Sequence, residues 1–479
     1  MTEYQAFVGG SNVSQSYSFD MERTVNMYLE QSERPGSTGQ SALYRRPGVN
    51  TLVTATAGPG KANFAQNGHN YAVIGAEFVE IGQFGAITVL GTVAQDNNPA
   101  FIVSNGDAGG QILVASGDNG YVWDLTALTF TQVRTGNTTT VGFLDGFFLA
   151  FSVSNSTFYV SDQLDGTVWD PTQFAQRSIA PDNWVTMIVF NRLIYLLGSQ
   201  TSEVWWNAGT FPFPFEPHPS GFMQWGCAAT FSPKAVNGSL YWLGTTLNGI
   251  GSILRANGFT PENIATKAIQ YALANYPTIS DAIGDALTWN GHNFYNAYLP
   301  IGNTTIVFDS DSNEFTEWGT WKVEQNQYDV WRACYHVFMF NEHRMLDLET
   351  GAVYRISDSY GVDVDDRPLR WLRRAPTVVN EMNRVYYARF EIYGDVGIGT
   401  STGQGEDPQV MMRYSDDGGR SWSNELSRSM GKMGEYNTRV FWDRLGQGRR
   451  RVFEVSGSDP VPYRLVSAFL TLGNGQGDQ

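Results

Sequence analysis

A short pattern that recurs along the first three quarters of the chain constrains the fold more than any other feature. In each copy an apolar strand ends in Asp, and another apolar residue follows six positions later; the clearest copies end at Asp124, Asp309 and Asp347. Such an Asp side chain accepts hydrogen bonds from the backbone two residues on and starts a tight turn. The pattern predicts β-hairpins, with Asp124, Asp309 and Asp347 as structural turn residues.

The spacing of this pattern favours one architecture. Weaker copies fall between the clear ones, so that turns stand at positions 80, 124, 170, 207, 257, 309 and 347, roughly 45 residues apart on average. A period of about 40 to 50 residues with several short strands is typical of β-propeller blades. A large β-sandwich is the alternative, but it has no such period. We predict an all-β chain with a propeller of about seven blades, six being possible.

The sequence pattern changes after Tyr360, where the Asp-turn repeat stops and longer, Arg-rich strands begin. We therefore predict four segments: an N-terminal arm over 1–54, the propeller over 55–360, a C-terminal β-sandwich-like domain over 361–472 and a flexible tail over 473–479. Residues 261–274 show helical spacing of apolar positions, with Thr260 as a cap and Pro261 in the first turn. This segment is the one helix predicted in the propeller.

Charge limits what the protein can bind. The net charge is -16, which excludes a nucleic-acid binder that depends on neutralising phosphates. Residues 1–359 carry 15 basic and 31 acidic side chains, whereas residues 360–479 carry 16 of each. The acidic excess therefore lies wholly in the first 359 residues. Arg outnumbers Lys by 26 to 5, and Arg is the cation favoured at protein interfaces.

The chain offers few residues for chemistry. Cys227 and Cys334 are predicted to be buried free thiols, and the five histidines show no metal-binding spacing and are predicted to lie on the surface or in loops. Asp363, Asp365 and Asp366 suggest calcium, but the order of an EF-hand is absent, so a solvated acidic loop is favoured. We predict no catalytic, cofactor or metal residue and no enzyme activity.

Targeting signals are also missing from the sequence. The first ten residues lack the basic and apolar regions of a secretion signal, and no window approaches about 18 apolar residues. We expect synthesis in a cytoplasm and no integral membrane segment.

One local motif leaves an alternative function open. Residues 415–422 match the Asp box, S-x-D-x-G-x-x-W, which forms a hairpin turn and occurs in several copies in sialidases and other glycoside-acting propellers. A single copy favours a structural turn, made by Ser415, Asp417, Gly419 and Trp422. Together with aromatic residues such as Trp205 and Phe211, it keeps a glycan-binding or glycan-hydrolysing, sialidase-like tail protein as the alternative.

Five motifs in order resemble one protein family. The first two are RTVNMY from Arg23 and LYRRPGV from Leu43; the others are LIYLLGSQTSEVWWNAG from Leu193, ATKAI from Ala265, and the strands 413–422 with 439–451. They resemble the packaged-DNA stabilisation proteins of short-tailed bacteriophages, also called tail hub, nozzle or head-completion proteins. The chain departs from the family pattern at Lys267 and Gln270, where the family has Glu in place of this Gln.

The resemblance implies a structural virion component of a phage tail, made in the host cytoplasm. Such proteins form rings, usually of six copies, which attach below the portal and its adaptor, extend the DNA channel and retain the packaged genome until ejection. The implied partners are further copies of the chain, the adaptor or connector above, and a tail needle, fibre or spike below. DNA would pass without specific binding, and we expect an acidic propeller surface to face the channel because it repels phosphate.

Assembly contacts are expected at the family motifs, at an aromatic loop and at an Arg run. Prolines alternate with Phe211, Phe213 and Phe215, and since proline has no N–H, this stretch is an extended loop; packing on the propeller and docking to a neighbour are equally open. The Arg449–Arg451 run favours a protein interface over a phosphate site. The candidate assembly-interface residues are Arg23, Asn26, Tyr28, Arg45, Arg46, Phe211, Phe213, Phe215, Arg449, Arg450 and Arg451.

Overall fold

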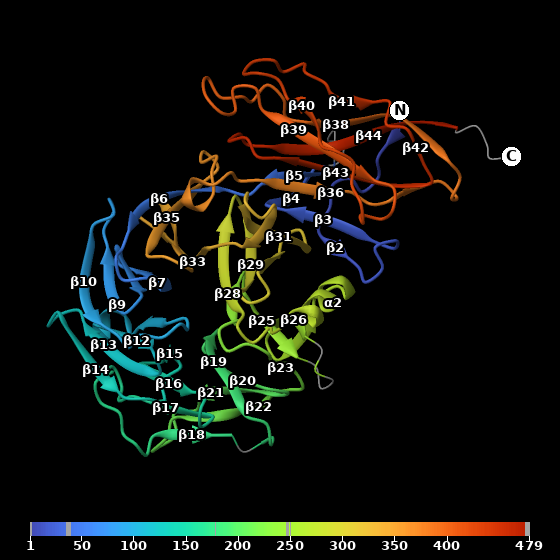
Figure 1. Ribbon diagram of the computed structural model, residues 1–479. Helices are drawn as coiled ribbons and strands as arrows, with labels where there is room; N and C mark the ends of the chain where they lie inside the picture. The colour runs from blue at the N-terminus through green and yellow to red at the C-terminus, as the bar shows by residue number, and fades with distance from the viewer. Residues whose placement is uncertain (1, 35–39, 178, 246–248, 250, 475–479) are drawn as a thin grey trace.

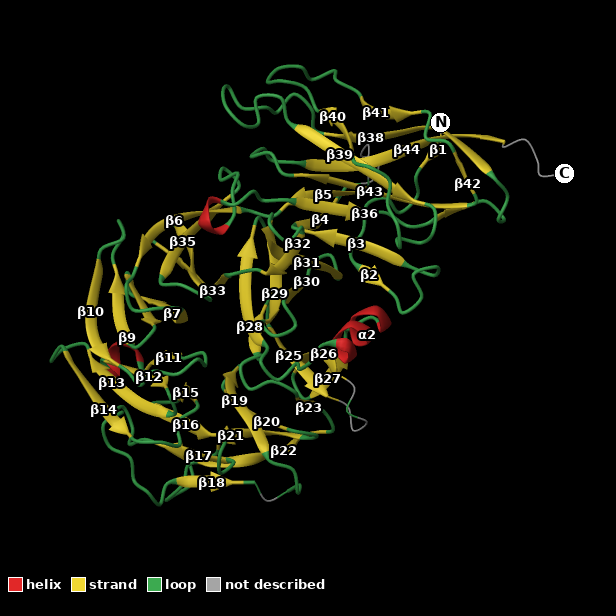
Figure 2. Ribbon diagram, in the orientation of Figure 1, coloured by secondary structure: helices red, strands yellow, loops and turns green. Residues whose placement is uncertain are grey.

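A ring of small sheets with a two-sheet sandwich over one edge makes up the protein (Figure 1). The computed structural model describes residues 2–34, 40–177, 179–245, 249 and 251–474. Nearly all regular structure in these residues is strand (Figure 2). The exceptions are α1 (Gly106–Gly109), α2 (Lys267–Asn275) and a short 3-10 turn over Val364–Asp366. The predicted all-β class, with a propeller and a C-terminal sandwich, is confirmed.

Seven antiparallel sheets form the blades of the ring in the described residues. Blade 1 contains β7 (Gly60–Gln66), β8 (His69–Ile74), β9 (Glu77–Ile81) and β10 (Ile87–Thr92). Blade 2 contains β11 (Phe101–Ser104), β12 (Gln111–Ser116), β13 (Asn119–Asp124) and β14 (Thr129–Arg134). Blade 3 contains β15 (Thr140–Leu144), β16 (Phe147–Ser152), β17 (Thr157–Val160) and β18 (Phe174–Gln176). Blade 4 contains β19 (Trp184–Phe190), β20 (Leu193–Gly198), β21 (Ser202–Asn207) and β22 (Phe215–Met223). Blade 5 contains β23 (Gly226–Cys227), β24 (Lys234–Val236), β25 (Ser239–Thr245), β26 (Gly251–Asn257) and β27 (Thr260–Asn263).

The last two blades lie beside the sandwich. Blade 6 is β28 (Ile283–Trp289), β29 (His292–Leu299), β30 (Thr304–Asp309) and β31 (Glu314–Lys322), with β32 (Gln327–Val330) paired to β31. Blade 7 is β33 (Ala333–Met339), β34 (Glu342–Asp347), β35 (Ala352–Ser357) and β6 (Gly48–Thr54). Since β6 precedes blade 1 in the chain but pairs with β35, as in the pair Val353 and Val53, an N-terminal strand closes the ring.

The centre of the ring is narrow and apolar. The first strands of neighbouring blades contact each other around the axis, among them β7, β11, β15 and β33. Five inner strands line a cavity of 640 Å³, whose walls include Phe101, Val141, Phe143 and Met187. Because the inner strands of neighbouring blades approach each other this closely around the axis, the ring has no room for a DNA duplex.

The sandwich combines N-terminal and C-terminal strands. One sheet contains β4 (Met27–Gln31), β5 (Ser41–Arg45), β44 (Arg464–Asn474), β38 (Val385–Gly394) and β41 (Val440–Asp443), with β1 (Thr2–Glu3) and β42 (Gln447–Gly448) at its sides. The other contains β3 (Met21–Val25), β36 (Trp371–Arg374), β43 (Arg450–Gly457), β39 (Gln409–Ser415) and β40 (Leu426–Ser429), with β2 (Asn12–Val13) and β37 (Val378–Val379). Buried aromatic rings such as Trp371, Phe390, Trp442 and Phe453 fill the space between the sheets.

The second sandwich sheet continues into the propeller. Val25 on β3 pairs in parallel with Glu317 on β31 of blade 6 and, on its other side, with Leu372 on β36. Residues 1–54, assigned to an arm in the sequence analysis, thus supply strands to both domains. Of the segment 473–479, only Gly473 and Asn474 lie within the described residues.

The predicted helix starts too early in the sequence. Thr260 and Pro261 belong to β27, the outer strand of blade 5, where Pro261 pairs with Ala256; proline is tolerated at a sheet edge because no neighbour needs its N–H. The N-cap of α2 is Thr266, whose hydroxyl accepts a hydrogen bond from the Ile269 N–H at 3.3 Å. Ile269 packs on blades 5 and 6, so tertiary contact fixes the helix there.

Candidate functional site

The junction between propeller and sandwich contains the first two family motifs, RTVNMY and LYRRPGV. Asn26 lies where the chain leaves β3 for β4, in the left-handed region with a φ of 57°, which Asn tolerates better than most residues. Its buried amide donates to the carbonyls of Gly319 and Arg370 at 2.9 and 2.7 Å, and its oxygen accepts from the Gly319 N–H and from Arg46 Nε. One side chain therefore links β31 of the propeller with Arg370, the residue before β36 of the sandwich.

Arg46 makes the most deeply buried ion pair of this junction. Its Nη2 lies 2.9 Å from Oδ2 of Asp363, and both side chains are 0% exposed. The guanidinium lies over the Trp331 ring, 4.6 Å from the centroid. Burial lowers the pKa of Arg46, and the Asp363 charge opposes this shift. Asp363 was predicted to belong to a solvated acidic loop; that prediction is wrong for this residue, because it is the counterion of a buried cation.

The other motif residues also make contacts inside the chain. Arg23 forms an ion pair with Glu317 of β31 at 2.7 Å. Arg45 donates to the carbonyls of Asp358 and Tyr360, and burial, with repulsion from neighbouring Arg46, lowers its pKa to about 10. Tyr28 is buried against His292, with 4.9 Å between ring centroids. Side chains engaged in this way connect the two domains of one copy and leave little surface for another copy.

His292 is a second link across the junction. Its Nδ1 lies 2.8 Å from Oδ2 of Asp309 in blade 6, and its Nε2 lies 3.2 Å from Oε2 of Glu30 on β4. Burial acts to lower the pKa of His292, but hydrogen bonding and attraction to Asp309 and Glu30 raise it from the usual 6.5 to about 9. A surface or loop position was predicted for this histidine. The prediction is wrong because His292 begins β29 of blade 6 and its imidazole is buried toward the sandwich.

The raised pKa predicts a pH dependence of stability. A histidine whose pKa rises on folding stabilises the protein fully below its unfolded pKa of about 6.5, and this contribution is lost as the pH rises through about 9. We expect the urea concentration at the unfolding midpoint of the wild type to decrease as the pH rises from about 6.5 to about 9. The His292→Gln variant should show a flatter profile; equal slopes in the two proteins would refute the link.

Two of the three aromatic loop residues pack against the propeller. Phe215 is buried, and Phe213 and Phe215 contact the Phe158 ring of blade 3 with centroid distances of 5.7 and 6.4 Å. Phe211, in contrast, is 95% exposed. Phe213 and Phe215 thus pack on the propeller, and docking to a neighbour stays a prediction for Phe211.

The Arg run is divided in the same way. Arg451 is buried, pairs with Asp416 at 2.6 Å and lies 3.9 Å from the Tyr414 ring centroid. Arg449 and Arg450 lie nearer the surface, where Arg449 donates to the Met382 carbonyl and Arg450 donates to the Ser18 hydroxyl. Arg449 and Arg450 remain candidates for contact with another molecule.

The Asp side chains of the repeat shape their turns through local hydrogen bonds. Asp124 accepts from the backbone N–H groups of Thr126 and Ala127, at 2.8 and 2.7 Å. Asp347 accepts in the same way from Glu349 and Thr350, and Asp309 from Asp311. These bonds end each strand and return the chain toward the next one.

The Asp box is likewise a closed turn. Asp417 accepts from the N–H groups of Arg420 and Ser421, Ser415 accepts from Gly419, and Trp422 Nε1 donates to the Gly419 carbonyl. The Ser421 hydroxyl also donates to Asp417. This bond, together with those from the backbone, holds the pKa of Asp417 well below its usual range. The carboxylate is therefore saturated by its own turn and is not aimed at a ligand.

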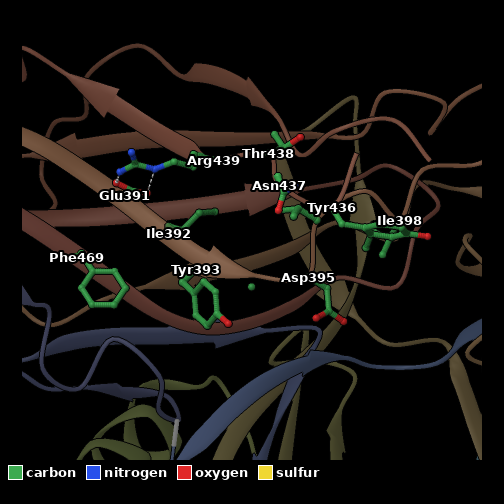
Figure 3. Close-up of a pocket in the computed structure, with 12 residues that line it drawn as sticks. Glu391, Ile392, Tyr393, Asp395, Ile398, Tyr436, Asn437, Thr438, Arg439 and Phe469 are labelled. Atoms are coloured by element: carbon green, nitrogen blue, oxygen red, sulfur yellow. Dashed lines mark hydrogen bonds and ion pairs between the residues drawn. The ribbon is translucent and has the colours of Figure 1, made fainter. Parts of the chain in front are cut away.

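A cleft of 580 Å³ opens at the end of β38 in the sandwich (Figure 3). Tyr393, Tyr436 and Phe469 form its apolar part, and Glu391 pairs with Arg439 at 2.7 Å at its rim. None of the candidate assembly residues lines it. Across the described ranges, no cluster of three or more metal-ligating side chains occurs, and no helix could cross a lipid bilayer.

Structural comparison gives distant likenesses to solved proteins. The N-terminal domain of Nup159 matches with 14% identity over 70% of this chain and 98% of its own, at a TM-score of 0.40. Streptogramin B lyase matches with 10% identity over 65% and 98%, at 0.41, and an exo-beta-1,3-galactanase from Phanerochaete chrysosporium with 9% over 88% and 100%, at 0.29. These likenesses carry no argument about function. No curated protein matches the sequence.

Family profiles cover almost the whole chain. The profile described as "Bacteriophage P22 Gp10, beta-propeller" matches residues 6–360, and the profile described as "Bacteriophage P22 Gp10, beta-sandwich" matches residues 370–473. Neither describes a glycan-acting protein. The chain belongs to the bacteriophage P22 Gp10 family, the structural tail-hub proteins of the virion that stabilise packaged DNA.

Proposed function

We propose that six copies of this chain form a closed ring, a nozzle that extends the DNA channel below the portal and its adaptor and holds the genome until ejection. The protein works by position and charge and not as an enzyme. It is made in the host cytoplasm, contacts an adaptor above, and carries a needle, fibre or spike below.

The observation that carries this proposal is the narrow centre of the propeller. The inner strands of neighbouring blades contact each other around the axis, which leaves a duplex no passage through one copy. A channel for DNA must therefore lie between copies, which requires an assembly with a hole. A closed ring of identical subunits is the ordinary way to build one, because a heterologous contact that closes on itself leaves an axial opening.

Charge supports the same arrangement. The acidic excess of 31 over 15 lies in residues 1–359, so propeller surface is the part that repels phosphate. A wall that repels phosphate lets DNA slide, whereas Arg or Lys contacts would hold it through counterion release. We therefore place acidic propeller surface toward the channel and the charge-balanced sandwich toward protein neighbours.

The rigid junction suits a hub that must resist the pressure of packaged DNA. Packaged DNA presses outward, and a hub of two loosely linked domains would yield at the linker. Here a continuous sheet from β31 through β3 to β36 crosses the boundary, and Asn26 and Arg46 anchor it on both sides. A force on the sandwich is therefore transmitted directly to blade 6.

DNA retention tests this function. Phage particles assembled without the chain should package DNA and then lose it, and supplying the wild-type chain in trans should restore the ratio of DNA to capsid protein. Particles that keep their genome without the chain would refute the proposal. So would a density map of the assembled ring in which basic side chains line the bore.

A further inference from the structure

The outer edge of blades 3 and 4 is an exposed apolar surface with acidic charge. Its exposed apolar side chains lie on β18, on the loop after it, on the loop before β22 and on β22: Phe174, Ile179, Phe211 and Phe222. These segments adjoin one another, because Ala175 of β18 and Phe213 of the loop pack on the same core cluster. We call this surface the distal rim, since it lies at the end of the ring away from the sandwich (Figure 1).

The charge of the distal rim is one-sided. Asp170 lies exposed just before β18. The two basic side chains of residues 160–223 are already paired with acids: Arg177 is buried between Asp182 and Glu203, and Arg192 pairs with Asp145. Glu216 stands exposed on β22 beside the aromatic residues. The rim therefore presents apolar rings amid negative charge, and its partner must be apolar and basic.

The sandwich, at the other end of the molecule from the rim (Figure 1), has a surface that is both apolar and basic. Val379, Met382 and Tyr386 are 49%, 54% and 36% exposed, and exposed Arg384 lies among them. Strand pairing brings Arg450 beside Val379 and Gly448 beside Val385. We call this surface the sandwich edge. In residues 378–386 and 444–450 the basic side chains Arg384, Arg444, Arg449 and Arg450 outnumber the one acidic residue, Glu381.

We propose that the distal rim of one copy docks on the sandwich edge of the next copy. The two surfaces are complementary in charge, and each carries exposed apolar side chains of the kind that interface centres bury. Because they are different surfaces on one chain, the contact is heterologous, so each copy can bind two neighbours and the series closes into a ring or continues as a filament. This contact rests on the proposed ring and names the surfaces that make it.

The proline content of the rim fits docking by side chains. Pro217 and Pro219 lie in β22, the outermost strand of blade 4. Proline removes backbone donors and blunts an edge strand against pairing with a strand from another chain. The rim therefore contacts its neighbour through apolar and charged side chains, and not by extending a sheet.

Two surface variants, each with one intact surface, test the contact. The rim variant carries Phe211→Ser and Glu216→Arg, and the edge variant carries Met382→Ser and Arg384→Gln; all four residues are exposed. Analytical ultracentrifugation of the full chain should show concentration-dependent assembly of the wild type and at least tenfold weaker assembly of either variant alone. A 1:1 mixture of the two variants should form dimers and nothing larger, since only one productive contact remains.

Controls separate this result from unfolding and from general loss of charge. A protein with Phe84→Ser and Arg34→Glu changes exposed residues outside both surfaces and should assemble like the wild type. Melting temperatures should match in all four proteins. A wild type that stays monomeric at the highest soluble concentration, variants that assemble normally, or a mixture without dimers would each overturn the contact. If particles with either variant still retain DNA while particles without the chain lose it, the ring stands and this contact falls.

Discussion

The Asp363→Ala variant should lose on the order of 3–5 kcal/mol of unfolding free energy, because it leaves the guanidinium of Arg46 buried without a counterion. Both side chains of this pair are 0% exposed, so no water can replace the lost carboxylate without opening the junction. Arg46 would keep its bonds to Asn26 and to the Pro47 carbonyl, which satisfy hydrogen bonding but not charge. Urea unfolding monitored by tryptophan fluorescence measures the change.

Two comparisons make this prediction specific to buried charge. Asp395→Ala breaks the exposed pair with Arg464, in which the side chains are 42% and 47% exposed, and should cost less than about 1 kcal/mol. The double variant Arg46→Met and Asp363→Leu removes both charges and should recover much of the loss. A single variant as stable as the Asp395 control would contradict the assignment of this pair to the junction.

Local chemistry explains what the sequence predicted well. An Asp at the end of a strand can bond the backbone two residues on wherever the strand lies, so the turns at Asp124, Asp309 and Asp347 and their period were visible without any tertiary information. The period then indicated the propeller. The Asp box was recognisable for the same reason, since its bonds lie within residues 415–422.

Contacts distant in sequence explain what could not be predicted. Arg46 and Asp363 are separated by more than 300 residues, and His292 finds Glu30 only because β4 runs beside blade 6. A motif such as RTVNMY marks residues that matter but not whether they face a second copy or the same chain. Likewise, alternating Pro and Phe predicts an extended loop, but only the position of Phe158 decides that Phe215 is buried and Phe211 is not.

The closure of the ring belongs to the same class. Residues 48–54 show no feature that distinguishes a free arm from a strand, since the partner β35 comes from the other end of the propeller. The pairing becomes favourable only when all blades are present. A sequence signal for it would be a strand before the first repeat together with a last repeat that is one strand short.

Arg373→Met should release the N-terminal segment 6–10 and cost at least about 3 kcal/mol, because this buried guanidinium uses every N–H it has. Nε donates to the Phe7 carbonyl at 2.6 Å, Nη1 donates to Gly9, Gly10 and Thr24, and Nη2 donates to Ala6 and to Glu22. The adjoining Ser11 N–H donates to the Phe315 carbonyl of blade 6. Loss of Arg373 therefore loosens a connection between sandwich and propeller.

The shape of the guanidinium, and not only its charge, should prove necessary. Arg373→Lys keeps the charge near Glu22 but offers three donors from one atom, which cannot reach all four backbone carbonyls that the guanidinium bonds between residues 6 and 10. Both variants should raise amide hydrogen exchange in residues 6–11 and 22–24, whereas Arg464→Met, at an exposed pair, should leave exchange there unchanged. Full protection in the Lys variant would show that charge alone holds this segment, and that the fork of bonds to the backbone is dispensable.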